Sequence, residues 1–455
     1  MPGLRKKKSA HPDLDLSAPR PDTPPLRDLA PVLVGRHAGL VRSLTLFHKP
    51  PAEPPWPLIY RAELANSRFL SDKAEAFQVA SGKGMDDDAA QVSALGEAVE
   101  RYAGMAWPGE DIRRCPRGDL PGLALDPQRL VLYGQAQYAN LPYAPLLPDS
   151  VLGWLPGRTL PSGQPIWVPA QPTLMAYTPA PAEPDLCQVT SNGLAAGPTL
   201  AQAALRAALE VLERDAFVAT WLLRLPCERV DPASVPDAGV RQLAAAYARR
   251  GVQLELYRLF PRGPVHCFVG LGVALQAAVL PAVVVGLGAD LDPVRAAASA
   301  ALEIGQVRPG LAYRLKDPQV QAQRAAMLEH TKLLKTLEDH DLYYAGHDTL
   351  AAFDFMRSAP FVTPDWRAPA VVEGEAAVRA LADDVAAQGS ELVLVNLTPP
   401  DLAALGVFAV RAFVPDFQPI YFGQQERRLA HRRLAQLAAR HGLDVTINPN
   451  PHPLA

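Results

Sequence analysis

Two short segments of the sequence carry carboxylates and an arginine at the spacing of one helix face. Residues three and four positions apart lie on the same side of a helix, so within each segment the charged groups should point the same way. The two sets are Glu97, Glu100 and Arg101, preceded by Ser93, and Glu210, Glu213 and Arg214. Carboxylates that converge without lysine partners suit Mg²⁺, which takes one or two carboxylates together with phosphate oxygens, and an adjacent arginine can bind a phosphate oxygen. The pattern therefore indicates a site for Mg²⁺ and phosphate.

Each set alone also fits a solvent-exposed ion pair, because Glu and Arg at this spacing are common on helix surfaces. Apolar residues flank the second set, among them Leu212, Phe217 and Trp221, and they predict that its charged side faces a cleft. Buried carboxylates need cations. From the residues alone, a metal–phosphate site and two surface ion pairs both remain open.

Alternating strand and helix patterns surround the two segments. Apolar and β-branched runs predict strands at 252–259, 265–273, 282–287, 392–397 and 407–414. Alanine-rich stretches with helical spacing predict helices at 200–221, 294–305 and 374–388. Such alternation is typical of an α/β architecture.

Composition narrows the class of protein. The chain has 455 residues, of which 49% are hydrophobic and 20% charged, and a net charge of -3. These values are ordinary for a globular protein and lack the charge footprint of nucleic-acid or membrane binding. Four separated cysteines without a CxxC pair speak against a zinc knuckle and a disulfide framework. The sequence shows neither a signal-peptide core nor an apolar run of membrane-spanning length, so we expect a cytoplasmic enzyme.

The N-terminal segment differs from the rest of the chain. Residues 1–30 carry the basic run Arg5-Lys6-Lys7-Lys8 and several prolines. Such a segment buries too little surface to offset its ordering entropy. We therefore expect a disordered tail over 1–30.

Three motifs in the central part of the chain resemble those of the YcaO family. Ser81-Gly82-Lys83-Gly84, followed by the set at 93–101, is similar to the first signature of that family, a GKG loop that leads into SxxxExxER. The stretch 190–199, which leads into 210–215, is similar to the second signature, and Glu303-Ile-Gly-Gln306-Val-Arg308 resembles a reduced third one. The motifs occur in the family's order.

The resemblance implies the YcaO fold, an α/β (α+β) fold with mixed sheets and packed helices around an ATP cleft. It implies a catalytic domain over 31–440 with core motifs at 81–308, and ATP and Mg²⁺ as cofactors, although the GKG loop lacks the spacing of a Walker A loop. The glutamates that it assigns to Mg²⁺ or its water shell are Glu97, Glu100, Glu210 and Glu213. The residues that it assigns to the nucleotide are Lys83, Ser93, Glu97, Arg101, Asn192, Glu210, Arg214 and Gln306.

The C-terminal third resembles the azoline-forming branch of the family. Segments 395–401 and 414–423 are similar to that branch, and the chain closes with Pro449, Pro451 and Pro453 in a PxPxP pattern. From composition alone, the tail over 441–455 is either a polyproline-like extension or a frayed terminus. The resemblance implies that its three prolines reach the active site and serve catalysis.

For this branch the resemblance implies ATP-dependent cyclodehydration, as in the making of thiazole/oxazole-modified microcins. A Cys, Ser or Thr side chain of a ribosomal precursor peptide adds to the preceding carbonyl, the adduct oxygen is phosphorylated, and phosphate leaves as a thiazoline or oxazoline forms. The implied partners are the precursor peptide, a separate leader-binding protein of the ThiF/ubiquitin-activating type, a flavin-dependent dehydrogenase and a second copy in a homodimer. A YcaO enzyme that makes thioamides or amidines, and a non-catalytic YcaO scaffold, are the alternatives.

Overall fold

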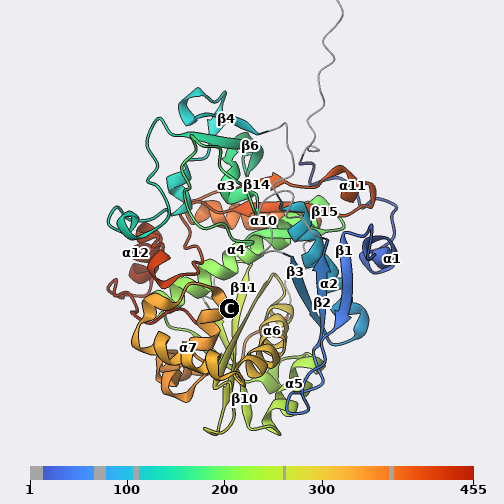
Figure 1. Cartoon of the computed structure of the whole chain (residues 1–455), viewed down its shortest axis with the longest axis vertical. Coiled ribbons are helices and arrows are strands. Elements are labelled where there is room, and N and C mark those ends of the chain that lie inside the picture. Colours follow the sequence, from blue (N-terminus) through green and yellow to red (C-terminus); the bar gives the residue numbers. More distant parts are fainter. Residues whose placement is uncertain (1–13, 66–77, 106–111, 260–262, 368–372, 455) are drawn as a thin grey trace, which may run out of the picture.

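Helices and mixed β-sheets alternate along the chain. The structure, a computed structural model, describes residues 14–65, 78–105, 112–259, 263–367 and 373–454. These residues form three sheets with helices packed between and around them (Figure 1). The α/β class expected from the sequence is therefore confirmed. No helix in the described part of the chain combines the length and the apolar character needed to cross a membrane.

The first sheet carries the first motif. Its antiparallel strands β1 (Val41–Leu46), β2 (Leu58–Leu64) and β3 (Val79–Gly84) lie in that order. Helix α2 (Asp87–Ala103) begins where the Asp86 side chain accepts the Ala89 N–H, and it packs on β2 and β3. The GKG strand and the first ExxER helix are thus direct neighbours.

The second sheet has five strands in the order β12-β11-β10-β9-β13. They are β9 (Glu228–Val230), β10 (Val252–Leu259), β11 (His266–Ala274), β12 (Val283–Asp290) and β13 (Phe361–Val362). Helix α6 (Pro293–Arg314) covers β11 and β12 and also contacts β3 of the first sheet. The third motif therefore lies against the first.

The third sheet brings together strands from distant parts of the sequence. Its order is β5-β7-β6-β14-β15-β8, with β4 paired to β6. The strands are β4 (Arg113–Pro116), β5 (Leu123–Ala124), β6 (Val151–Leu160), β7 (Pro165–Pro169), β8 (Leu194–Gly197), β14 (Leu392–Asn396) and β15 (Phe408–Phe413).

Helix α4 (Leu200–Leu223) lies between the second and third sheets. It contacts β8 and β15 on one side and β11 and β12 on the other, and Figure 1 shows it crossing the middle of the molecule. Its side chains Trp221 and Phe217 are fully buried in the largest apolar cluster. Because most of the surface of this helix is buried, apolar residues occur on most of its sides.

Shorter helices complete the fold. The α-helices are α1 (Ala30–Leu33), α3 (Ala170–Thr173), α5 (Ala238–Ala248), α7 (Pro318–Glu329), α8 (Leu337–Tyr343), α9 (Asp354–Arg357), α10 (Gly374–Ala387), α11 (Pro400–Ala404) and α12 (His431–Arg440). The 3-10 helices are η1 (Leu26–Leu29), η3 (Arg117–Asp119), η4 (Pro127–Leu130), η5 (Gln137–Asn140), η6 (Pro232–Ser234), η7 (Thr331–Leu333), η8 (His347–Phe353) and η9 (Gln424–Glu426).

The elements predicted from periodicity are present with small shifts at their ends. Strand β10 matches the expected range, and α4 begins at the expected residue. Helix α6 continues past its expected end at 305 to Arg314 with Pro309 inside it, and Leu311 on the added turns is buried. All four cysteines are free thiols, as expected.

Part of the N-terminal segment departs from the expected disorder. Residues 1–13, with the basic run, lie outside the described residues. Beyond them, Leu16 and Leu29 are buried and join two apolar clusters. Local composition did not predict this packing, because it depends on contacts with distant parts of the chain.

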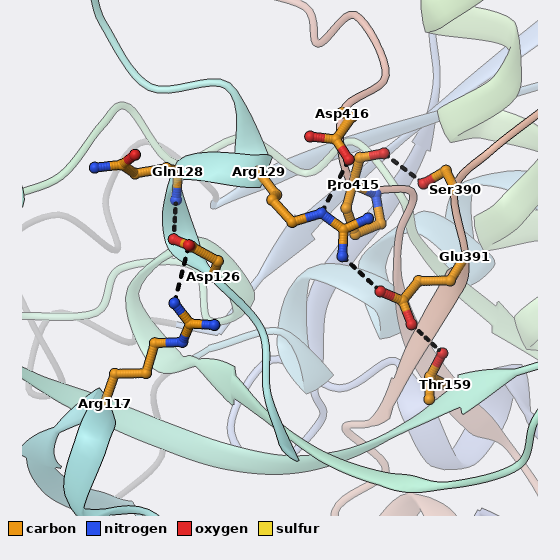
Figure 2. Close-up of polar contacts among 9 residues, drawn as sticks. All are labelled: Arg117, Asp126, Gln128, Arg129, Thr159, Ser390, Glu391, Pro415 and Asp416. Carbon is orange, nitrogen blue, oxygen red and sulfur yellow. Dashed lines mark hydrogen bonds and ion pairs between the residues drawn. The ribbon is translucent and has the colours of Figure 1, made fainter.

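An ion-pair network joins the η4 segment to the ends of β14 and β15 (Figure 2). Arg129 binds Glu391 (2.7 Å) on one side and Asp416 (2.9 Å) on the other. Glu391 in turn accepts a hydrogen bond from the Thr159 hydroxyl (2.6 Å), and Ser390 donates to the Pro415 carbonyl. The network holds two loops beside the third sheet in fixed positions.

Glycines let the motif helices lie directly on their strands. A Cβ added at Gly82 would come within 1.9 Å of the Ala94 backbone nitrogen, and one at Gly84 within 2.4 Å of the Ala90 nitrogen. A Cβ at Gly197 of β8 would likewise come within 2.7 Å of the Ala203 backbone nitrogen of α4. The glycines of the GKG motif are therefore required for helix–strand packing, and they leave Lys83 on the opposite face of β3.

We predict that Gly82→Ala lowers the free energy of unfolding by about 1–3 kcal/mol or more, because the added methyl must push α2 away from β3. Gly96 on α2 is the matched control, since a Cβ there meets nothing within 4 Å. Gly96→Ala should instead stabilise the helix by roughly 0.5–1 kcal/mol. Urea unfolding of both variants is the measurement, and equal stability of the Gly82 variant and the parent would contradict the close approach.

Candidate functional site

Two strand–helix units meet at the predicted site. In each unit the same kind of hydrogen bond joins the helix to its strand. In the first unit, Glu97 of α2 accepts a hydrogen bond from the Ser81 N–H of β3 (3.0 Å). In the second, Glu210 of α4 accepts one from the N–H of Gly193, the residue before β8 (3.0 Å). The first glutamate of each predicted motif thus holds its helix to the preceding strand.

A third unit repeats this contact. Glu303 of α6 accepts a hydrogen bond from the Leu287 N–H of β12 (2.9 Å), and glycines on β12 again lie against the helix. The three hydrogen bonds span 16, 17 and 16 residues of sequence. Sequence reasoning gave a role only to Gln306 of this motif, although Glu303 was visible in it.

The units are also joined to one another. Glu100 of α2 accepts a hydrogen bond from the Ala196 N–H of β8 (3.1 Å), and the Arg206 guanidinium of α4 donates to the carbonyl of the same residue (3.1 Å). Residues of the first and second motif helices therefore both bind the backbone of Ala196 in β8.

The first and third units are connected on the other side. Lys83 Nζ lies 3.7 Å from a Glu303 carboxylate oxygen. Gln306 Nε2 donates to the Ser81 hydroxyl (2.7 Å). The structure thus brings the GKG strand and all three motif helices to one place.

Each predicted arginine pairs with glutamates of its own helix. Arg101 donates to Glu97 through Nη2 (2.6 Å) and Nε (3.1 Å). Arg214 lies 3.1 Å from Glu213 and 3.7 Å from Glu210. The expectation that these side chains share a helix face is correct, and they are largely sheltered from solvent rather than on an open surface.

The carboxylates repel one another in a buried setting. Burial, together with the carboxylates of Glu97 and Glu210, raises the pKa of Glu100 to about 8. The pKa of Glu213 is also raised, by burial and by the carboxylate of Glu303. A cation at this place would relieve both effects.

The donor set fits an ion that shares its coordination with phosphate. In the described part of the chain, no three Asp, Glu, His or Cys side chains are spaced to hold a metal ion alone. Mg²⁺ does not require such a cage, because it takes one or two carboxylates and completes its shell with phosphate oxygens and water. Glu97, Glu100, Glu210 and Glu213 could therefore hold it with a nucleotide present.

Two predicted nucleotide contacts lie at the edges of this cluster. Ser93 is one turn before Glu97 on α2 and is exposed. Asn192 directly precedes Gly193, and its Oδ1 is buried with no hydrogen-bond donor among the described residues.

The C-terminal tail is inserted into the molecule. Pro449 is exposed, whereas Pro451 and Pro453 are buried. The Trp221 indole donates to the carbonyl of Asn450 (3.2 Å), and the Tyr344 hydroxyl donates to that of Pro451 (2.6 Å). A frayed terminus does not describe these residues, and Figure 1 shows the C-terminus near the centre of the molecule.

Histidine packing connects the tail to α8 and to segment 421–422. The His452 ring stacks on that of His340 with 3.9 Å between centroids, and its Nε2 lies 2.7 Å from the Tyr421 carbonyl oxygen. Burial lowers the pKa of His452, and the positive charges of His340 and Arg214 act in the same direction.

A neighbouring buried polar cluster was missed from the sequence. Arg308 of α6 pairs with Glu53 at 3.2 Å, and the Lys49 ammonium is buried with no hydrogen-bond acceptor in the described segments. Burial lowers the pKa of Lys49 to about 8, partly countered by Glu53. No local pattern predicts this cluster, because its members come from two distant segments.

The family model described as YcaO cyclodehydratase, ATP- and Mg²⁺-binding, matches residues 81–418. The chain belongs to the YcaO family. That span contains the glutamates and the strand N–H groups of all three units, and ATP and Mg²⁺ are accordingly the cofactors that the family match gives.

Relatives of this YcaO protein include uncharacterised proteins of archaea and bacteria. One from Methanothermobacter thermautotrophicus is 29% identical over 57% of this chain and 65% of its own length. One in the tfuA 3′ region of Rhizobium leguminosarum bv. trifolii is 29% identical over 52% and 56%, respectively. The matches thus span less than two thirds of these relatives.

Solved YcaO structures share the fold. A heterocyclase in complex with substrate and cofactor has a TM-score of 0.77 at 23% identity, over 99% of this chain and 59% of its own. YcaO from Methanopyrus kandleri bound with AMPPCP and Mg²⁺ has a TM-score of 0.58 at 20% identity, over 85% of this chain and 87% of its own. The expected YcaO fold is therefore confirmed.

We predict that Glu100→Gln and Glu213→Gln each lower ATP turnover by about a hundredfold or more, since each removes a charge that would hold the metal beside the phosphates. The double variant should be scarcely worse than either single one, because the groups act as a unit. ADP release is the measurement. Full activity of either variant would remove these glutamates from the site.

The fold of the Glu100 variant provides an internal control. Because the pKa of Glu100 rises from 4.5 to about 8 in the folded protein, the folded state binds its proton more tightly than the unfolded chain. Without nucleotide, the free energy of unfolding should therefore fall as the pH rises from 4.5 to about 8. Glu100→Gln removes this loss, so at pH 8 it should unfold no earlier than the parent. Glu375→Gln, in an exposed Glu–Arg pair on α10, should change neither turnover nor stability appreciably.

Proposed function

We propose that this YcaO protein cyclises Cys, Ser or Thr residues of a ribosomal precursor peptide to thiazolines or oxazolines. The observation that supports this reaction most is the placement of the PxPxP tail, whose Pro451 and Pro453 are buried and whose start is hydrogen-bonded to the end of the helix that carries the second ExxER motif. A tail in that position can line the path of a peptide to the phosphates. The family match supports the use of ATP in the same reaction.

In this reaction the side-chain sulfur or oxygen forms a bond to the preceding carbonyl carbon. The carbonyl oxygen must then leave so that the ring carbon can form a double bond to nitrogen. ATP with Mg²⁺ supplies the phosphoryl group that makes this oxygen a leaving group, so that each ring removes one water from the peptide and yields ADP and phosphate.

The residues of this chain would contribute position and charge. The four motif glutamates hold the cation, while Lys83, Arg101 and Arg214 neutralise phosphate oxygens. Their mutual hydrogen bonds set these groups before the substrate arrives, and such preorganisation is the main source of catalysis in phosphoryl transfer.

A separate partner is proposed to deliver the peptide. One structure of the same fold, with a TM-score of 0.54 at 12% identity, is that of the E. coli microcin synthetase McbBCD complex. By analogy, a leader-binding partner should raise ATP turnover of this chain with the precursor peptide, mainly by positioning it. Titration of a labelled leader tests this, and submicromolar binding by this chain alone would contradict it.

The tail gives the sharpest test of the reaction. Deleting residues 449–455 should abolish ring formation while nucleotide affinity is largely retained, because the glutamates lie elsewhere in the chain. Mass spectrometry counts the waters lost from the peptide, and calorimetry measures the nucleotide.

The deletion also opens apolar space, since His452 and Leu454 are buried, so the melting temperature should fall. Nucleotide affinity therefore serves as the fold control. Val445→Ala, at an exposed residue of the same tail, is the milder control and should cyclise at nearly the parent rate. If the truncated enzyme formed rings at the rate of the full-length protein, the proposed role of the tail would be wrong.

A further inference from the structure

A small cavity lies on the third sheet, apart from the three motif helices' carboxylates. Its volume is about 80 Å³, and β15, segment 187–192 and segment 417–420 supply most of its walls. Val211, the neighbour of Glu210 on α4, also lines it. The cavity thus opens next to the second motif without including its charged groups.

One wall of the cavity carries a buried arginine. Arg411 of β15 is 3% exposed. Its Nη2 donates to the carbonyls of Pro172 (3.0 Å) and Thr190 (2.7 Å). Its Nε and Nη1 are buried and meet no hydrogen-bond acceptor within the described residues. Two strong donors are therefore left without partners beside an open space, a costly arrangement unless a ligand satisfies them.

The lining of the cavity is cationic. It contains Arg411 and Arg428 and no aspartate or glutamate. Burial lowers the pKa of Arg411 to about 10, so the group remains a cation at neutral pH. A buried charge normally has an ionic partner. The carboxylate of Glu210 acts on Arg411 from outside the cavity, and no acidic side chain lines the cavity to pair with it.

Acidic residues near the cavity are already engaged. Asp416 and Glu391 both bind Arg129 in the network of Figure 2. Glu210 accepts the Gly193 N–H and pairs with Arg214. The network also fixes the loops next to Leu130 and Val414, which line the cavity, so the walls cannot easily collapse onto the arginine.

The remaining surface suits a short apolar stem and a hydrogen-bond donor. Phe413 and Cys187 contribute apolar area, and Asn192, another lining residue, has a buried Oδ1 without a donor among the described residues. An acidic amino-acid residue offers a carboxylate, a short stem and a backbone N–H. A free small carboxylate offers the first of these.

We propose that this cavity is a binding subsite for a carboxylate group, with Arg411 as its charge partner. The occupant is either an acidic side chain of a bound peptide or a small free carboxylate. The proposal does not depend on the proposed cyclisation, because none of the four motif glutamates lines the cavity.

The test measures carboxylate binding to the full chain without nucleotide. The probes are acetate, N-acetylglutamate methylamide and its glutamine counterpart, titrated by calorimetry at constant ionic strength. At least one carboxylate probe should bind the parent protein, and Arg411→Met should weaken it on the order of tenfold or more. The glutamine probe should bind much more weakly than the glutamate probe.

The Arg411 variant should still fold. Arg411→Met removes the desolvation cost of a buried charge but also leaves the carbonyls of Pro172 and Thr190 without their donor, so the melting temperature without ligand should stay close to that of the parent. Cys187→Met narrows the cavity while keeping the charge, and it should weaken the same probe. If Arg411→Met does not fold, the binding measured with Cys187→Met tests the proposal instead.

The two carboxylate probes separate the sources of the ligand. Preference for the glutamate derivative supports a peptide side chain, and equal binding of acetate supports a free carboxylate. Binding that does not change in either variant, or equal binding of the glutamine probe, would overturn the proposal, as would the absence of binding by both carboxylates.

Discussion

The site depends on a hydrogen bond from a strand N–H to a glutamate of the helix that follows it. Glu97, Glu210 and Glu303 each make this bond. It requires the helix to lie almost in contact with the strand, and the glycines at 82, 197 and 286 allow that approach. The bond fixes the rotation of each helix about its axis and its distance from the sheet. The direction of the next glutamate or arginine on the same face is therefore fixed as well. Because the three units pack on one another, these directions converge.

Convergence has an electrostatic cost that binding can offset. Several buried carboxylates repel one another, as the raised pKa of Glu100 shows, and Lys83, Arg101 and Arg214 compensate only part of this repulsion. A nucleotide alone would add negative charge, whereas an Mg²⁺ ion shared between phosphates and carboxylates lets both sets of oxygens approach. The arrangement therefore favours joint binding of metal and nucleotide, and the protein tolerates some lost stability at the site in return.

Much of the fold could be predicted, because its main elements carry their own periodicity. The apolar pattern of α4 and the β-branched run of β10 identify these elements without tertiary information, and Glu97 with Arg101 share a face because helix geometry requires it. The three-unit repeat was only partly visible, since Glu303 lacks the second glutamate and arginine of the other motifs. Arg411 and Lys49 had no local signal. Their burial arises when distant strands and loops close around them, and a single sequence contains no measure of that closure.

Helix α4 connects the carboxylates of the second motif to the C-terminal tail. Arg214 lies about two turns before Trp221, roughly 10 Å along the axis, and Glu210 about three turns before it, roughly 16 Å. At that second point, Asn448 donates to the Trp221 carbonyl (3.0 Å), and the Leu222 carbonyl accepts the Asn448 backbone N–H (2.7 Å). These carbonyls are free because the helix ends there, with Arg224 in the left-handed conformation. The end of the helix thus binds the start of the tail. A displacement of α4 would move the carboxylates and the tail together, so their relative geometry is maintained by a single rigid element.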